Sequence, residues 1–276
     1  MEHVDGNGTA IPALGLGTWT LRGAKATRLV AGAIEAGYRH FDTAVTYENE
    51  AAVGAGLRDV GIDRDQVFVT TKVRPSDIGA GDLQRSVEAS LGRLGLEHID
   101  LALIHWPSAS IPLAESITAL NDVAARGLAR AIGVSNFPVA LLEQAVALSA
   151  RPLACNQIEY HPYLGQDRVL AACRRHGIAV VSYSPIAQAG DLFREASVQA
   201  AAAAHDKSPA QVVLRWQLQQ PGVAAIPRSS NLERIAENID IFGFALSADE
   251  MAAIHGLKAR RLRLLDMGMS AAWDPA

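Results

Sequence analysis

Cysteine is scarce in this chain, which has only Cys155 and Cys173 among its 276 residues. One lies in an expected strand and the other in an expected helix, so they cannot form the framework of disulfides that stabilises many small secreted proteins. This scarcity favours a reducing compartment. We therefore expect a cytoplasmic protein.

Long apolar runs and clusters of positive charge are also lacking. Residues 1–8 have neither the basic start nor the apolar centre of a signal peptide, and no later run is long enough to cross a membrane. The formal net charge is −4 with no basic cluster, which gives no electrostatic reason to expect a nucleic-acid partner. With 49% apolar and 20% charged residues, the composition predicts a soluble globular protein, which we expect to be a monomer.

The glycine-rich turn of doubly wound dinucleotide-binding domains is incomplete here. The nearest match, Gly15-Leu16-Gly17-Thr18-Trp19-Thr20, lacks the last glycine, so such a domain is unsupported. No linker divides the chain, and its length lies within the usual range of one α/β barrel. We expect residues 1–276 to form a single domain.

The sequence does contain a repeated alternation of short apolar strands with amphipathic helices. Asp5-Gly6-Asn7-Gly8 predicts a hairpin turn before the repeat. The predicted strands are 14–19, 38–43, 67–73, 99–106, 129–135, 153–159, 178–184 and 223–227. The predicted helices that follow them are 24–36, 50–59, 80–94, 113–125, 138–149, 167–176, 194–205 and 231–240.

Two further helices are predicted near the C-terminus, at 208–219 and 248–257, with Ser208 capping the first and Pro209 at its first position. Several strands are apolar on successive residues, which is typical of a sheet covered on both faces. Eight alternations predict a closed α/β barrel, the (β/α)8 TIM barrel, with an N-terminal β-hairpin and extra helices near the C-terminus.

Polar, titratable residues follow three consecutive strands. Asp42 and Tyr47 come at the end of the second strand, Lys72 at the end of the third and His105 at the end of the fourth. The next helix begins after Asn49, which we expect to cap it. Since the active sites of such barrels lie at the carboxyl ends of the strands, we expect the four titratable side chains to meet in one mouth.

These four groups suit proton transfer to a carbonyl oxygen. A free phenol has a pKa of about 10, but an ammonium roughly 4 Å away, at an effective dielectric of about 20, favours the phenolate by about 4 kcal/mol before the opposing cost of burial. Lys72 is therefore expected to bring the pKa of Tyr47 into the working range, with Asp42 orienting Lys72. His105 is placed to donate a hydrogen bond to a carbonyl oxygen.

Taken singly, each of these residues is better explained as a solvated or paired polar residue at a strand end. Together they favour an active site. A glycosidase on the same barrel needs two flanking carboxylates, which strand ends such as His105-Trp106-Pro107 do not offer. A metal-dependent hydrolase needs clustered histidines and acids, but the remaining histidines are scattered, and we expect no metal site.

At this level of detail the sequence resembles the aldo-keto reductase family, from Gly15 to Asn238. The resemblance implies reduction of a small-molecule carbonyl compound by NADPH, with Tyr47 as general acid and Asp42, Lys72 and His105 in the roles given above. The motifs that carry it are Gly-Leu-Gly-Thr-Trp at 15–19, Phe-Asp-Thr-Ala at 41–44 with Tyr47 and Asn49-Glu50, Thr71-Lys72, His105-Trp106-Pro107, Gly-Val-Ser-Asn-Phe at 133–137, Asn156-Gln157, Ser-Tyr-Ser-Pro at 182–185 and Ile-Pro-Arg-Ser at 226–229.

The resemblance also implies a set of cofactor contacts. Ser135, Asn136 and Gln157 would bind the nicotinamide carboxamide and Tyr183 would stack on its ring, although local pairing of the two amides and simple core packing of Tyr183 are alternatives. The whole expected set is Gly17, Thr18, Asp42, Ser135, Asn136, Gln157, Tyr183, Ser184, Pro185, Ile186, Ala187, Ile226, Arg228, Ser229, Ser230, Arg234, Glu237 and Asn238.

The stretch from Arg228 to Asn231, with Arg234 on the next helix, indicates the choice of cofactor. Two arginines and nearby hydroxyls at a helix N-terminus suit a dianionic phosphate. In the family this position recognises the 2′-phosphate of NADPH, usually through lysine at 228. Arginine keeps the charge and adds a fork of donors, so we expect NADPH to be preferred over NADH.

Substrate contacts are expected from Trp19, Val45, Tyr47, His105 and Trp106, with Phe137 as a further wall, although each apolar member singly is better explained by packing. For Tyr163 and Arg168 surface pairing is the better explanation. The spacing of the short tail, with Ala272-Trp273-Asp274 near its end, resembles that of the bacterial 2,5-diketo-D-gluconate reductases, which implies 2,5-diketo-D-gluconate or methylglyoxal as substrate. The alternative is a low-turnover nicotinamide-binding redox sensor of the same fold.

Overall fold

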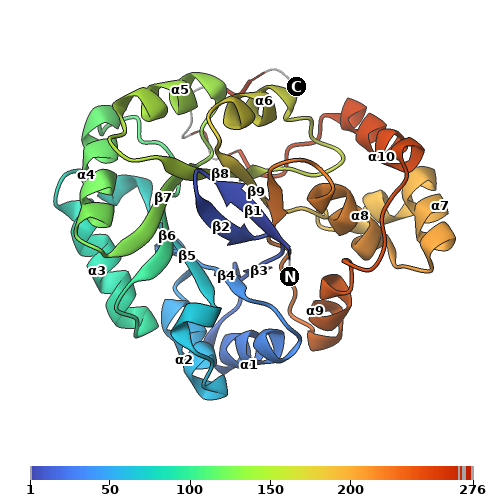
Figure 1. The fold of residues 1–276 in the computed structure, drawn as a ribbon, viewed down its shortest axis with the longest axis horizontal. Helices are drawn as coiled ribbons and strands as arrows, with labels where there is room; N and C mark the ends of the chain where they lie inside the picture. Colours follow the sequence, from blue (N-terminus) through green and yellow to red (C-terminus); the bar gives the residue numbers. More distant parts are fainter. Residues whose placement is uncertain (1, 267, 269–271, 275–276) are drawn as a thin grey trace.

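A short antiparallel hairpin closes one end of the molecule, in a computed structural model that describes residues 2–266, 268 and 272–274. Its strands are β1 (His3–Gly6) and β2 (Thr9–Pro12), and the turn between them uses positive φ at Asn7 and Gly8, as predicted. The Asn7 side chain donates to the carbonyl oxygens of Leu153 and His176. The hairpin therefore lies across the amino ends of the barrel strands (Figure 1).

Eight parallel strands form one sheet in the order in which they occur along the chain. The two end strands also meet, because Leu14 forms a parallel bridge with Ala225 and Gly17 N donates to Pro227 O at 3.0 Å. The predicted barrel is confirmed. Its strands are β3 (Leu16–Gly17), β4 (His40–Asp42), β5 (Phe68–Val73), β6 (Ile99–Ile104), β7 (Ala129–Ser135), β8 (Leu153–Glu159), β9 (Ala179–Tyr183) and β10 (Val223–Ala225).

Helices surround the barrel in Figure 1 and follow the predicted alternation. The extra helices are confirmed as α8 and α10, and the predicted helix 194–205 is present as α7, which begins two residues later, after a 3-10 turn at Gly190–Arg194. The helices are α1 (Gly23–Glu35), α2 (Glu50–Val60), α3 (Asp82–Leu94), α4 (Leu113–Ala125), α5 (Val139–Leu148), α6 (Asp167–Arg175), α7 (Ala196–His205), α8 (Pro209–Leu218), α9 (Leu232–Ile239) and α10 (Ala248–His255). In the described part of the chain, none of them is both long and apolar enough to cross a membrane.

The helix caps show one correct and one wrong prediction. Ser208 caps α8 as predicted, accepting from Gln211 N at 3.3 Å. Asn49 stands at the start of α2, but its side chain does not cap that helix. Its amide instead donates to Thr18 O and Leu21 O and accepts from the Thr43 hydroxyl, which ties the loops after β3 and β4 together.

The core has two layers because side chains of successive strand residues point to opposite sides of the sheet. One cluster fills the barrel interior above the hairpin, with Ile11, Leu101, Leu103, Val181 and Ala224 among its members. The larger cluster lies between the strands and the helices. Burial on both faces explains why the strands are apolar on successive residues, as expected.

Candidate active site

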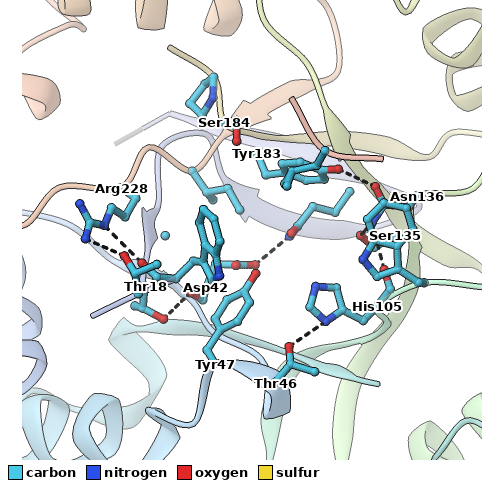
Figure 2. Close-up of a pocket in the computed structure, with 18 of the residues that line it drawn as sticks. Thr18, Asp42, Thr46, Tyr47, His105, Ser135, Asn136, Tyr183, Ser184 and Arg228 are labelled. Carbon is cyan, nitrogen blue, oxygen red and sulfur yellow. Dashed lines mark hydrogen bonds between the residues drawn. The ribbon is translucent and has the colours of Figure 1, made fainter. Parts of the chain in front are cut away.

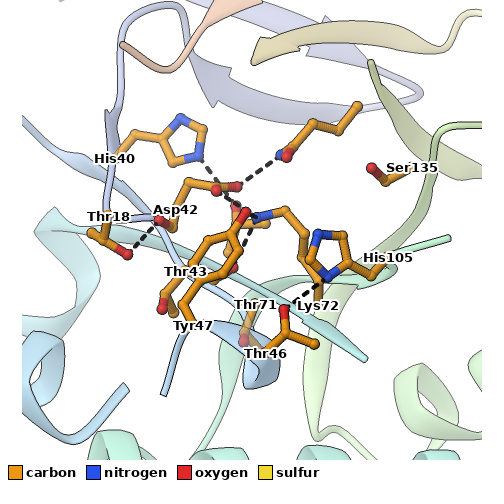
Figure 3. A network of polar contacts seen from close by, with 12 residues as sticks. Thr18, His40, Asp42, Thr43, Thr46, Tyr47, Thr71, Lys72, His105 and Ser135 are labelled. Atoms are coloured by element: carbon orange, nitrogen blue, oxygen red, sulfur yellow. Dashed lines mark hydrogen bonds and ion pairs between the residues drawn. The ribbon is translucent and has the colours of Figure 1, made fainter. Parts of the chain in front are cut away.

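Three consecutive strands deliver the catalytic candidates to one end of the barrel. Asp42 ends β4, a 3-10 turn at Val45–Tyr47 carries the phenol, Lys72 lies near the end of β5, and His105 follows β6 directly. In Figure 3 the four side chains point toward one another. The predicted convergence is therefore present in the structure.

Lys72 is the centre of this group and is completely buried. Its ammonium donates to Asp42 Oδ1 at 2.5 Å, to the Thr43 carbonyl oxygen at 2.9 Å and to the Tyr47 hydroxyl oxygen at 3.3 Å. Each of the three N–H groups of the ammonium therefore has an acceptor. A charged group that is excluded from water requires such partners. The fold thus holds a cation against the phenol at a set distance.

The pKa values of Tyr47 and Lys72 are both raised, whereas a lowered pKa was expected for Tyr47. Burial raises the pKa of Tyr47 and the Asp42 charge adds to this, while the Lys72 ammonium opposes both without reversing them. Burial alone would lower the pKa of Lys72, but Asp42 and Tyr47 raise it above its ordinary value. The expected net lowering of the Tyr47 pKa is therefore wrong, because the cost of burying a phenolate exceeds the stabilisation by Lys72.

His105 is held as a neutral imidazole. Burial, with a smaller contribution from the Lys72 charge, lowers its pKa to about 3. Its Nδ1 lies 3.3 Å from the Thr46 hydroxyl, and its ring packs edge to face on Tyr47 at 5.7 Å between ring centroids. A neutral ring with one nitrogen paired has the other available as a donor or acceptor toward the cavity.

Three of the expected nicotinamide ligands are linked to each other. The Tyr183 hydroxyl donates to Asn136 Oδ1 at 2.8 Å, and Asn136 Nδ2 donates to the Ser135 hydroxyl and to the His105 carbonyl oxygen, both at 3.0 Å. Asn136 adopts a positive φ of 63°. These bonds fix the three side chains on one side of the cavity shown in Figure 2.

Gln157 links this side to the catalytic candidates around Lys72. Its Nε2 donates to Asp42 Oδ2 at 2.7 Å, so the Asp42 carboxylate has one oxygen on Lys72 and the other on Gln157. Among the described residues no donor approaches Gln157 Oε1, and Gln157 lines the cavity. Its carbonyl oxygen is therefore a candidate acceptor for a ligand amide.

The two expected phosphate-binding arginines are exposed. Arg228 follows β10 and donates from Nε to Trp19 O at 3.2 Å and from Nη2 to the Thr20 hydroxyl at 2.6 Å. These contacts join the loop after β10 to the loop after β3, at the side of the cavity opposite Asn136 in Figure 2. Arg234 lies in the first turn of α9, which the Asn231 side chain caps.

A cavity of about 870 Å³ joins these parts, large enough for a cofactor and a small substrate. It is lined by most of the expected residues, and Lys72 lies behind it. The expected residues on its lining are Gly17, Thr18, Trp19, Asp42, Tyr47, His105, Trp106, Ser135, Asn136, Gln157, Tyr183, Ser184, Pro185, Ile186, Ile226, Arg228 and Arg234.

Some expected residues are not on this lining: Val45, Phe137, Ala187, Ser229, Ser230, Glu237 and Asn238. The Ser229 hydroxyl is engaged with the backbone of Asn231, and Phe137 lines a second, smaller cavity instead. The Tyr163 hydroxyl donates to Glu195, but Tyr163 is buried, so its expected surface pairing is wrong. Among the described residues Arg168 forms no ion pair, and neither residue lines the main cavity.

Other lining residues were missed: Thr20, Thr46, Arg74, Pro75, Ser76, Gln188, Ala189 and Leu265. Thr46 and Arg74 could have been predicted, because Thr46 is next to Tyr47 and Arg74 is two residues after Lys72. Leu265 could not, because no pattern in the sequence shows that the C-terminal segment returns to the barrel. Among the described residues, no group of three or more His, Cys, Asp and Glu side chains is placed to hold a metal ion.

A closed barrel with a large cavity at the carboxyl ends of its strands defines the class of (β/α)8-barrel enzymes. Residues 13–199 and 191–259 match the model of the Aldo/keto reductase family. The chain belongs to this family and is an oxidoreductase of the aldo-keto reductase type.

The most similar proteins include several with different substrates in their names. A 2,5-diketo-D-gluconic acid reductase B of Corynebacterium sp. (strain SHS752001) is 42% identical over 94% of this chain and 92% of its own. A morphine 6-dehydrogenase of Pseudomonas putida is 43% identical over 98% of this chain and 92% of its own. A crystal structure provisionally assigned as a 2,5-diketo-D-gluconic acid reductase B has a TM-score of 0.96 at 41% identity, covering 100% of this chain and 98% of that one.

Proposed function

We propose that the protein reduces aldehydes and ketones to alcohols with NADPH, using Tyr47 as the general acid. The observation that carries the proposal is the contact of the Lys72 ammonium with both Asp42 and Tyr47, beside His105 and on the edge of a cavity of about 870 Å³. Two free, buried thiols, Cys155 and Cys173, support a reducing compartment, and we include the cytoplasm in the proposal.

The side chains present fit a nicotinamide dinucleotide. Ser135, Asn136 and the open Oε1 of Gln157 offer polar partners for a carboxamide, and the Tyr183 ring beside them is anchored through its hydroxyl. Arg228 and Arg234 supply positive charge at the other side of the cavity, which suits the additional phosphate of NADPH. When bound, NADPH supplies the hydride for the carbonyl carbon.

The residues of the catalytic group have distinct tasks. The raised pKa of Tyr47 keeps the phenol protonated at neutral pH, so it has a proton to give to the carbonyl oxygen. Lys72, 3.3 Å away and held charged by Asp42, stabilises the phenolate that remains. Neutral His105 orients the carbonyl oxygen by a hydrogen bond, and Trp106, buried beside it, limits the space for the substrate.

The proposed substrates are small dicarbonyl compounds, 2,5-diketo-D-gluconate or methylglyoxal. The relative named for 2,5-diketo-D-gluconic acid supports the first, and a half-exposed Trp19 at the cavity supports a site open to several carbonyl compounds. A relative of similar identity is named for a different substrate, morphine.

A steady-state panel of methylglyoxal, 2,5-diketo-D-gluconate and a nitrobenzaldehyde, each with NADPH and with NADH, tests the proposal. We expect turnover with at least one carbonyl and a higher kcat/KM with NADPH. Equal kcat/KM values for the two cofactors would contradict the cofactor assignment. Tight NADPH binding without turnover across the panel would instead favour the redox sensor.

A further inference from the structure

Glu159, the last residue of β8, has a fully buried carboxylate that accepts hydrogen bonds from a distant part of the chain. Leu264 N donates to Oε1 at 2.6 Å and Leu265 N donates to Oε2 at 2.9 Å. His161 Nε2 lies 3.0 Å from Oε1. A carboxylate excluded from water requires such donors, and two of the three come from backbone more than one hundred residues away in sequence.

The segment that Glu159 holds, residues 260–266, reaches the cavity. Leu265 is one of the residues that line it. The N–H group of Leu265 itself is bonded to Glu159, so the carboxylate holds the backbone that carries this side chain. In Figure 1 the described residues after α10 run back across the molecule toward α5 and α6.

Further contacts hold the segment at its beginning. Arg260 Nη2 lies 2.5 Å from Glu195 Oε1, and Leu262 N donates to Tyr163 O at 2.9 Å. All these partners belong to β8 and the loops after β8 and β9, so the segment is held along one side of the mouth of the barrel.

Beyond the segment, the described tail residues pack on the expected substrate wall. The Arg263 guanidinium lies 3.9 Å over the ring of Trp273, and that ring meets Trp106 edge to face at 5.9 Å. Asp274 accepts from Val139 N at 2.8 Å, at the first turn of α5. The position of the segment is therefore coupled to an aromatic pair at the cavity.

Glu159 is also related to the catalytic group through its strand. Gln157, two residues earlier and on the same face of β8, bonds Asp42, while Glu159 bonds the C-terminal segment. Two residues on one face of β8 thus contact Asp42 and the backbone that carries Leu265. Neither contact requires a bound ligand.

We propose that Glu159 is a positioning residue for substrate binding, whose carboxylate holds residues 260–266 so that Leu265 forms one wall of the substrate cavity. The proposal rests on the proposed carbonyl reduction for its kinetic part only. It assigns no chemical step to Glu159. Its effect is on substrate affinity.

The Glu159→Gln variant tests this at nearly constant volume. An amide has one acceptor oxygen and a donor NH2 group, and the donor would face a backbone N–H, so one of the two bonds to the segment is lost. We expect KM for the carbonyl substrate to rise about 10-fold, with kcat and the NADPH Kd each within about 2-fold. We also expect trypsin to cleave after Arg260, Arg261 and Arg263 about 10-fold faster, because the segment is released.

Two tail variants keep the proposal testable if Glu159→Gln folds poorly. Leu265→Pro removes the N–H that donates to Glu159 and leaves the barrel untouched, so it should raise both KM and the tryptic rate. Leu265→Ala removes only the wall, so it should raise KM and leave the tryptic rate unchanged. The double variant Glu159→Gln/Leu265→Pro should show no larger KM than the more affected single variant, because both changes displace the same wall of the cavity.

Glu143→Gln is the matched control. Like Glu159, Glu143 bonds a histidine, His176, but it lies on the outer surface and its other partner is Arg175. The Glu143→Gln variant should have the KM and the rate of tryptic cleavage of the wild type. Wild-type KM and cleavage rates in Glu159→Gln, or multiplied KM effects in the double variant, would overturn the proposal. If wild-type protein reduces no carbonyl compound, the proposed function fails, and the tryptic rates alone still decide whether Glu159 holds the segment.

Discussion

The two sides of the cavity are built in different ways. Around Lys72 the charged groups are fully buried, every position of the ammonium is satisfied, and the side chains come from consecutive strands. Around Arg228 and Arg234 the charges are exposed and lie on a loop and a helix start. Buried groups can be held to a set geometry and have strongly shifted pKa values, whereas exposed guanidinium groups attract an anion while keeping their hydration.

Substitutions on the buried side should have large kinetic effects, and we expect the largest for Tyr47→Phe. Removing the phenol removes the proton donor while the ring remains, so kcat should fall roughly 10³-fold. NADPH affinity, measured by quenching of tryptophan fluorescence, should stay within about 2-fold. Near-normal kcat in this variant would show that the proton donor is misassigned.

Lys72→Met should destabilise the buried side as well as inactivate it. It leaves the Asp42 carboxylate buried with only the Gln157 amide as partner, which costs about 3–5 kcal/mol. Urea unfolding measures this loss. The double variant Lys72→Met/Asp42→Asn should recover part of the stability, because no unpaired charge remains. A single variant as stable as wild type would mean that the pair is not buried in solution.

The lowered pKa of His105 should make the stability of the folded protein decrease as the pH falls. Its pKa is about 3 in the folded protein and about 6.5 in the unfolded chain, so below pH 6.5 the unfolded state binds the additional proton. The stability that depends on neutral His105 is present above pH 6.5 and falls as the pH is lowered toward 3. Relative to wild type, His105→Gln should therefore gain about 2 kcal/mol of stability between pH 6.5 and 5. An unchanged difference would place His105 in water.

The exposed side should give the smallest effect, confined to one cofactor. Arg234→Ala should raise the NADPH Kd about 10-fold and change the NADH Kd by less than 2-fold, since only NADPH carries the additional phosphate. Titrations at low and high salt should show the difference shrinking with ionic strength. Unchanged NADPH affinity in this variant would contradict the assignment of the phosphate site.

The barrel and the meeting of the proposed catalytic side chains were predictable from local patterns. Strand and helix periods repeat eight times, and the rule that parallel strands end at one edge of a sheet brings Asp42, Lys72 and His105 together. The limits of the strands were less predictable: β3 has only two residues, where six were expected. Asn49 was misassigned as a cap because its Oδ1, the atom that a cap would use, accepts from the Thr43 hydroxyl instead.

Residue identity and order along the chain determined the family, the barrel and the strand ends that carry the proposed acid–base groups. Only the tertiary structure decided the direction of the Tyr47 pKa shift, because burial is a property of all the surrounding chain. It also decided that Gln157 bonds Asp42 and that Glu159 holds Leu265 at the cavity. These contacts join residues more than one hundred positions apart, and no local sequence pattern encodes such a distance.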